Sequence, residues 1–286
     1  MRVVALEEHV TFPALAKTID PAAIAARGHY KGRKVAPGKV SPIELLAEVG
    51  EKRFKSMDDA GISFTVLSNS GPGPDLVPGP DGVTLAQKVN DYLADVVVKH
   101  PKRFAGFAAL PMAAPDACAA ELKRAVKDLK MVGAMIHGTT AGRFLDHPSY
   151  DALLSAAVEL DVPIYIHPNV PSLDIQKAYY SGLPDGADRV VGTAGWGWHS
   201  EVAIHILRMV MAGTFDKHPK LNMMVPHYGV VFWKPADLQR LADARDRAAR
   251  AHPRDEGVEV APGRLDNLGA GGAAVHGGVR RVVELL

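Results

Sequence analysis

Three apolar segments of the chain lead into residues that commonly bind metal ions. The segment Val3–Leu6 is followed by Glu7 and, two positions later, by His9. A second segment ends at His167 and a third at His227. Because side chains alternate along a strand, Glu7 and His9 point the same way. A mixture of carboxylate oxygen and imidazole nitrogen suits a divalent ion such as zinc or manganese.

These residues can share one ion only if the fold brings their strands to a common edge. A parallel β-barrel does this, because the carboxyl ends of its strands surround the mouth where its active sites form. The spacing therefore favours a site that gathers Glu7, His9, His167 and His227. The alternative is structural, since a single histidine near a strand end more often satisfies local hydrogen bonds than binds a metal.

Short apolar segments alternate with longer amphipathic ones, which is typical of a parallel sheet covered by helices. Strands are expected at residues 3–7, 63–68, 104–110, 132–137, 163–167 and 221–226. Helices are expected at residues 45–60, 85–100, 116–129, 150–160 and 201–212. The pattern predicts the α/β class and favours a (β/α)8 barrel of the TIM type.

The last part of the chain departs from this pattern. After about residue 250 it is rich in Gly and Arg, and only residues 258–261 and 279–286 are candidates for the last two strands of a barrel. We therefore predict a barrel domain over residues 1–250 and a divergent or truncated tail over residues 251–286. Whether the barrel closes is left open.

Composition narrows the class of partner. The 286 residues include 33 Lys and Arg against 32 Asp and Glu, so the charge of +1 gives no basis for binding nucleic acid or an anionic membrane. The single cysteine, Cys118, excludes an internal disulfide and a cysteine metal cluster. No segment reaches the roughly 20 apolar residues of a membrane span, and the first residues lack the apolar core of a signal peptide. We expect a cytoplasmic protein with a small-molecule partner.

Four blocks in the same order carry a resemblance to a known family. They are ALEEH at 5–9, FAGFAALP at 104–111, DVPIYIHP at 161–168 and GTFDKHPKL at 213–221. From about residue 1 to about residue 245 the chain resembles the amidohydrolase-related, metal-dependent decarboxylases. That family includes the γ-resorcylate, 2,3-dihydroxybenzoate and aminocarboxymuconate semialdehyde decarboxylases.

The resemblance implies an amidohydrolase-type (β/α)8 barrel with one divalent metal ion, zinc first and manganese or magnesium as alternatives. It implies Glu7, His9 and His167 as metal ligands and His227 as a catalytic residue beside the metal. The implied reaction is nonoxidative decarboxylation of a small aromatic or enoic carboxylic acid. A homo-oligomer is expected by the same analogy.

Two departures from the family pattern bear on activity. Val230 stands where the family usually has a glutamate after the motif that begins at His227. The aspartate expected at the eighth strand is also missing, because neither Asp255 nor Asp266 lies in the Ser/Thr-x-Asp context of the family. Weak or no turnover is therefore expected. The alternatives are a metal-dependent hydrolase of a lactone or amide and a catalytically impaired barrel remnant.

Further polar and aromatic residues near the predicted strand ends are candidates for the pocket. His137 closes the fourth predicted strand, and either contacts substrate or is a hydrogen-bonded rim residue. Trp198, with Trp196 and His199, precedes a predicted helix, and either lines the substrate pocket or packs in the core.

Outside the pocket, His205 and Arg208 are expected on a helix surface or an interface. Asp146 is expected to form a rim ion pair with Arg143.

Overall fold

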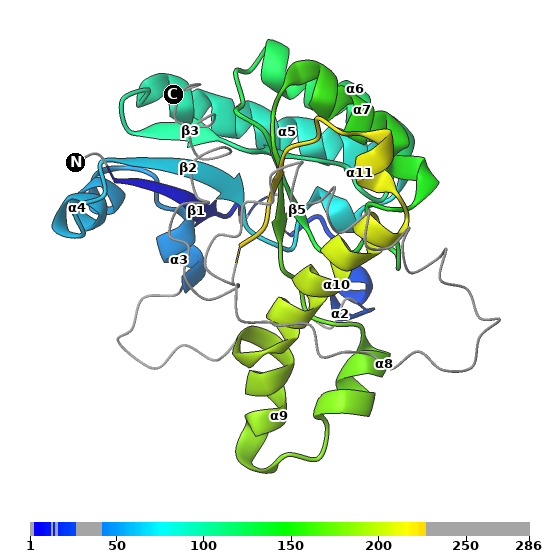
Figure 1. The fold of residues 1–286 in the computed structure, drawn as a ribbon. Helices are drawn as coiled ribbons and strands as arrows, with labels where there is room; N and C mark the ends of the chain where they lie inside the picture. The colour runs from blue at the N-terminus through cyan, green and yellow to red at the C-terminus, as the bar shows by residue number, and fades with distance from the viewer. Residues whose placement is uncertain (1–2, 13, 15–16, 27–41, 227–286) are drawn as a thin grey trace, which may run out of the picture.

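The computed structural model describes residues 3–12, 14, 17–26 and 42–226, and its strands are all parallel (Figure 1). Each strand lies beside the next along the chain, in the orders β1-β2-β3 and β4-β5-β6-β7. The strands are β1 (Val4–Val10), β2 (Phe64–Asn69), β3 (Phe104–Gly106), β4 (Ala108–Ala109), β5 (Ala134–His137), β6 (Ile164–His167) and β7 (Met223–Met224).

The two groups of strands are joined at Phe107, the single residue between β3 and β4. Its amide donates to Leu67 O of β2 (2.8 Å), and the next amide, Ala108 N, donates to Gly133 O beside β5 (2.9 Å). The predicted strand at 104–110 therefore spans both β3 and β4. All six predicted strands are found, which confirms the α/β class, whereas the candidates for the last two strands lie outside the described residues.

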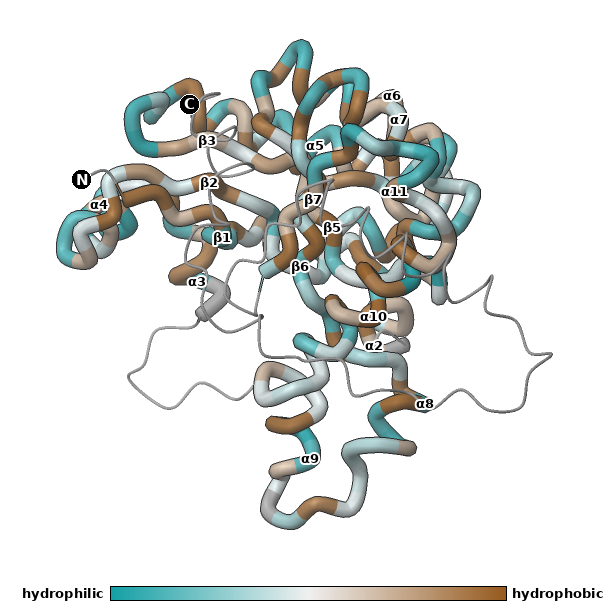
Figure 2. Tube along the Cα trace, in the orientation of Figure 1, coloured by the Kyte–Doolittle hydropathy of each residue, from teal (hydrophilic) through white to brown (hydrophobic). Residues whose placement is uncertain are grey.

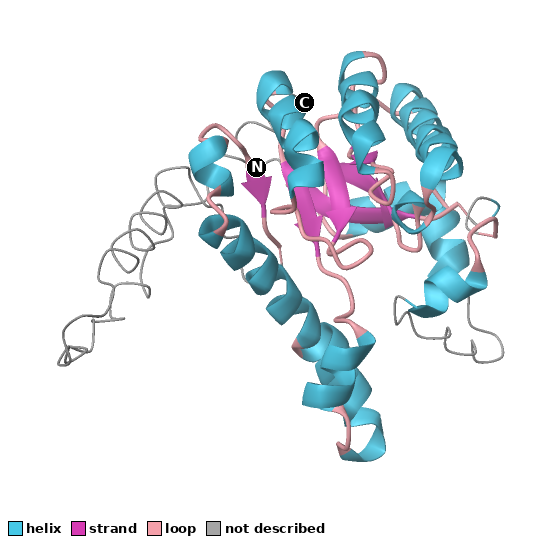
Figure 3. Cartoon of the chain, turned by 90° about the vertical axis from the view of Figure 1, so that its right-hand side faces the viewer, coloured by secondary structure: helices cyan, strands magenta, loops and turns pink. Residues whose placement is uncertain are grey.

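Helices connect the strands and cover one side of the sheet (Figures 1 and 3). The helices are α2 (Pro21–Ala26), α3 (Pro42–Ala47), α4 (Glu51–Asp59), α5 (Gly79–Lys99), α6 (Pro115–Lys127), α7 (Asp151–Leu160), α8 (Leu173–Ile175), α9 (Ala187–Val190), α10 (Gly197–Met211) and α11 (Thr214–Lys217). Short helical turns lie at Pro74–Leu76 (η1), Pro148–Tyr150 (η2), Gln176–Tyr180 (η3), Pro184–Gly186 (η4) and Val191–Gly195 (η5). Among the described helices, none combines the length and the apolar character that a membrane span requires.

The helix predicted at residues 45–60 is divided into α3 and α4. Glu48 lies between them, and its carboxylate accepts hydrogen bonds from Gly50 N (2.7 Å) and Arg53 N (2.8 Å) at the start of α4. A carboxylate is stabilised by the free amides at a helix N-terminus, so this side chain defines a new helix start.

Alternate residues of the strands pack on opposite faces of the sheet. Ile164 and Ile166 of β6 are fully buried in the larger hydrophobic cluster, between the sheet and α5, α6 and α7. Tyr165 belongs to a smaller cluster on the other face, with Phe107. We call this second face the inner face. His167, two residues after Tyr165, lies on it. Figure 2 shows hydrophobic residues along β1 and β5 and hydrophilic residues on the outer turns of the helices.

A buried polar network fixes α5 and α6 to the end of β4. The Asn90 side chain donates to Ala109 O (2.9 Å) and Glu121 Oε1 (2.6 Å), and its own oxygen accepts from Ala109 N (2.8 Å). Glu121 in turn pairs with Arg124 through both carboxylate oxygens, each at 2.9 Å. Asn90 and Glu121 are only 0% and 3% exposed. Unmade hydrogen bonds would be costly there, so the network holds the two helices in place.

The prediction that His205 lies on a helix surface is wrong, whereas Arg208 is exposed as predicted. His205 is 1% exposed, and its Nε2 accepts a hydrogen bond from Leu145 N (3.0 Å). An acceptor nitrogen requires a neutral ring, and burial lowers the pKa of His205 to about 4. The predicted pairing of Asp146 with Arg143 is also wrong, because Asp146 pairs with Arg208 (2.8 Å).

Replacement of Asn90 by Ala should lower the free energy of unfolding by about 2–4 kcal/mol, because it leaves buried donors and acceptors on Ala109 and Glu121 unpaired. Urea denaturation measures the loss. Lys88→Ala, at an exposed position of the same helix, is the control and should change the free energy by less than about 0.5 kcal/mol. Equal effects of the two substitutions would show that the network contributes little.

Acid should destabilise the fold through His205. The unfolded chain binds a proton at this residue below a pH of about 6.5, whereas the folded chain does so only below about 4. Stability therefore falls as the pH drops through this window, by on the order of 3 kcal/mol from this group. His205→Gln should flatten the pH dependence measured by denaturation between pH 7 and 4. The exposed His147→Gln should leave it unchanged.

Candidate metal centre

The three side chains predicted as metal ligands lie together at the carboxyl ends of β1 and β6. Nε2 of His9 is 3.1 Å from Nε2 of His167. Oε1 of Glu7 is 3.4 Å from His167 Nε2 and 3.9 Å from His9 Nε2. One donor atom from each residue lies within 4.8 Å of the others. Residues separated by almost 160 positions are thus brought to one point on the inner face.

The local structure of β1 directs two of its polar side chains to the site. The strand is longer than predicted and runs through His9 to Val10. It contains a one-residue bulge at Leu6 and Glu7, a feature that strands often use to redirect a side chain near a functional site. Glu8 points the other way and pairs with the guanidinium of Arg53, which is 8% exposed. Glu7 and His9 are therefore the two polar side chains of β1 that reach the metal centre.

Hydrogen bonds assign the tautomers of the two histidines. His167 Nδ1 donates to Pro168 O (2.7 Å). Ser68 Oγ donates to Glu8 O (3.4 Å), so it accepts from His9 Nδ1 at 2.9 Å. With Nδ1 protonated, the neutral form of each ring has its lone pair on Nε2, which faces the site. This arrangement is typical of histidine ligands, whose second nitrogen is held by another group.

The donor set fits one divalent ion. Two lone pairs at 3.1 Å repel unless a proton or a cation lies between them. With metal–nitrogen bonds of about 2.0–2.1 Å, two ligand nitrogens on one ion lie about 3.0–3.4 Å apart. The carboxylate of Glu7 adds an oxygen donor and a negative charge.

Tyr165 orients the Glu7 carboxylate. Its hydroxyl donates a hydrogen bond to Glu7 Oε2, which leaves Oε1 facing the two histidines. Burial and the neighbouring carboxylate raise the pKa of Tyr165, so the phenol stays protonated and remains a donor. Sequence reasoning missed this residue, although it lies two positions before His167 and therefore on the same face.

The donors open into a cavity of about 310 Å³. It is lined by Glu7, His9, Ser70, Gly71, His137, His167, Pro168, Asn169, Val170 and Trp198. The ring centroids of His137 and Trp198 lie 5.1 Å and 6.4 Å from that of His167. His137 also hydrogen-bonds through Nε2 to Asn69 O (3.0 Å), so it is both a cavity residue and a hydrogen-bonded one. Asn169, also missed from the sequence, donates to His137 O (3.2 Å).

Other predicted residues lie elsewhere. Trp196 is 46% exposed, and neither it nor His199 is among the described residues that line this cavity. His227, predicted as catalytic, lies outside the described residues, as do Val230 and the tail at 251–286 with Asp255 and Asp266.

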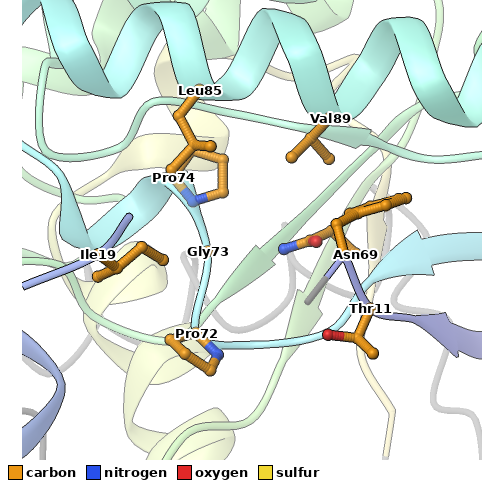
Figure 4. Close-up of a pocket in the computed structure, with 9 residues that line it drawn as sticks. Thr11, Ile19, Asn69, Pro72, Gly73, Pro74, Leu85 and Val89 are labelled. Carbon is orange, nitrogen blue, oxygen red and sulfur yellow. The ribbon is translucent and has the colours of Figure 1, made fainter. Parts of the chain in front are cut away.

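A neighbouring void is too small for a ligand (Figure 4). Its volume is about 10 Å³, which holds at most one water molecule. Its walls come from the loop after β2, from α5 and from Thr11, Phe12 and Ile19. It therefore belongs to the packing of that loop.

Comparison with known proteins places this geometry in a family. The sequence model of the amidohydrolase family matches residues 22–253. Decarboxylase orsB of Emericella nidulans is 34% identical over 88% of this chain and 72% of its own length. The γ-resorcylate decarboxylase of a Rhizobium species is 34% identical over 79% of this chain and 66% of its own length.

Comparison with solved structures supports the same family assignment. The dihydroxybenzoic acid decarboxylase of Polaromonas sp. JS666, with bound manganese and the inhibitor 2-nitroresorcinol, superposes with a TM-score of 0.65. It is 30% identical, and the match covers 78% of this chain and 64% of that one. The chain thus spans about two thirds of the length of these relatives. Its matched family model, its relatives and its parallel strands show that the chain belongs to the amidohydrolase family.

Proposed function

We propose that this chain is a metal-dependent nonoxidative decarboxylase of a small aromatic or enoic carboxylic acid. The observation that carries the proposal is the convergence of Glu7, His9 and His167 on one cavity. Relatives that share at least 34% of residues with the chain are named decarboxylases. The chain matches about two thirds of their length, so their activity is an inference for this protein.

Glu7 Oε1 and the Nε2 atoms of His9 and His167 would hold the ion. When bound, it supplies a Lewis acid and a template for the carboxylate and a neighbouring hydroxyl of the substrate. Two nitrogens and one oxygen suit zinc, the first choice from the sequence, and manganese, which the Polaromonas enzyme holds. We infer that either ion can occupy the site. Comparing the activity of the zinc-loaded protein with that of the manganese-loaded protein would identify the native ion.

The cavity walls suit a flat acid. The lining combines the three donors and His137 with the apolar Pro168, Val170 and Trp198. A volume of about 310 Å³ is at the lower end of the range for small-molecule sites. We infer that the substrate carboxylate lies beside the donors, that its ring or double bond packs against Trp198, and that His137 contacts a polar substituent.

Decarboxylation requires a proton at the carbon that carries the carboxylate. The carbon–carbon bond then breaks, carbon dioxide leaves, and the bonding electrons return to the ring or double bond. We propose His227 as a catalytic residue that assists the delivery of this proton, since imidazole titrates near neutral pH. The expectation of weak or no turnover stays a prediction, which the rate of carbon dioxide release tests. A cytoplasmic location and a homo-oligomeric state are proposals of the same kind.

Purified protein loaded with manganese or zinc should release carbon dioxide from 2,6-dihydroxybenzoate or another hydroxybenzoate, and a chelator should abolish the release. His167→Ala should lower bound metal, measured by elemental analysis, to below about a tenth of an equivalent because one of three donors is lost. The exposed His147→Ala is the matched control and should retain the metal. If neither ion supports release from any hydroxybenzoate, the proposed reaction is wrong.

Removal of the Tyr165 hydroxyl should weaken metal binding without removing a ligand. Tyr165→Phe should lower the affinity by about 10–100-fold, because the Glu7 carboxylate loses the group that orients it. Competition with a chelating dye measures this. Tyr150→Phe is the control: it removes a buried hydrogen bond to Met112 O (2.9 Å) and should cost about 1 kcal/mol of stability with unchanged metal affinity. Equal affinities in the two variants would exclude this orienting role.

A further inference from the structure

A second and larger cavity, of about 520 Å³, lies at the same end of the sheet as the metal centre. Its walls come mainly from the loops that follow β2, β4, β5 and β6, and it shares Val170 with the metal cavity. The lining residues are Ala23, Asp75, Leu76, Pro78, Ala113, Thr139, Thr140, Ala141, Gly142, Arg143, Val170 and Ser172. The proposed reaction uses none of these polar groups.

Arg143 is the only lysine or arginine among the described residues of this wall. Its Nε is buried without a hydrogen-bond partner. In the part of the chain that the structure describes, its guanidinium forms no ion pair, whereas Arg53, Arg124 and Arg208 are each paired with carboxylates. The side chain is partly exposed, and a guanidinium keeps its charge and five N–H donors, so it favours an anionic acceptor.

A tight turn fixes the backbone of Arg143. Thr140 N donates to Arg143 O (3.1 Å), and Arg143 N donates to Thr140 O (3.0 Å). The two residues between them, Ala141 and Gly142, have φ values of +50° and +72°, as in a type I′ turn. An alanine in this conformation costs on the order of 1 kcal/mol, so the surrounding structure must hold the turn in place.

The residues after Arg143 are held as well. The Phe144 ring lies under Arg208, with the guanidinium 4.7 Å from its centroid, and Leu145 N is bound by His205. Asp146, the acid nearest in sequence, is already paired with Arg208. Asp75 on the cavity wall is 6% exposed and takes part in an interaction of its own. Neither of these two acids therefore pairs with Arg143, and a ligand can supply the negative charge.

We propose that Arg143 binds a carboxylate in this second cavity, and that the carboxylate is the second acidic group of a dicarboxylic aromatic or enoic substrate. The planar guanidinium matches the two oxygens of a carboxylate, and Thr139 on the same wall offers a hydroxyl donor. The assignment to a substrate rests on the proposed function. The carboxylate site itself rests only on the cavity and on the charge of Arg143.

Binding of isophthalate, a dicarboxylate, and of benzoate, a monocarboxylate, to the manganese-loaded protein tests the proposal by calorimetry. Arg143→Gln should weaken isophthalate binding at least 10-fold and change benzoate binding less than 2-fold. Arg103→Gln is the matched control, because Arg103 precedes β3 at the other end of the sheet and pairs with Asp58. It should bind both acids as the unaltered chain does.

The stoichiometry of benzoate distinguishes the two sources of a carboxylate. If the second cavity binds a separate small acid, two equivalents of benzoate should bind to the unaltered protein and one to Arg143→Gln. This result would still support a carboxylate site at Arg143. Unchanged affinity and stoichiometry for both acids in Arg143→Gln would overturn the proposal.

A second variant guards against a folding defect. Arg143→Lys keeps the positive charge but loses the planar guanidinium that binds both carboxylate oxygens. This variant should bind isophthalate about 3–10-fold more weakly than the unaltered protein does. An unchanged affinity would count against the site. Thermal unfolding verifies that each variant is folded. Binding is measured without turnover, so this test does not depend on catalysis. If the protein releases no carbon dioxide but the Arg143 variants bind isophthalate more weakly, the carboxylate site stands and only the proposed reaction is wrong.

Discussion

The opposition of two imidazole lone pairs is the constraint on which the site depends. Nε2 of His9 and Nε2 of His167 are 3.1 Å apart, and the proton of each ring is committed on the other side, to Ser68 and to Pro168 O. Such a pair is unfavourable unless positive charge lies between the nitrogens. The carboxylate of Glu7, held by Tyr165, adds the negative charge that makes a cation the best occupant.

The fold provides this arrangement through a few simple regularities. Parallel strands in chain order place their carboxyl ends at one edge, and the alternation of side chains assigns Tyr165 and His167 to the inner face and Ile164 and Ile166 to the helices. The bulge in β1 then adjusts the direction of Glu7. The site is therefore a consequence of sheet geometry more than of any one loop.

The sequence predicted the strands, because apolar segments are local signals, and it predicted that Glu7, His9 and His167 lie together, because parallel strands share a carboxyl edge. It did not reveal that β1 continues through His9, since this depends on pairing with β2. The sequence pattern predicted a surface position for His205, because helical periodicity does not show that the loop containing Leu145 covers this side of α10. The sequence did not indicate Tyr165 as a site residue, because its partner Glu7 is distant in sequence. It did not indicate the role proposed for Arg143, because that role depends on which described residues leave its side chain unpaired.

The stability of the fold and the chemistry of the site rest on different groups. The network of Asn90 and Glu121 is almost fully buried and lies among β4, α5 and α6, whereas the side chains of Glu7, His9 and His167 are 28%, 22% and 14% exposed. Partly solvated ligands lose less when their ion leaves, because water can replace it. Loss of the metal should therefore disturb the inner face locally while the helix-covered face of the sheet stays folded.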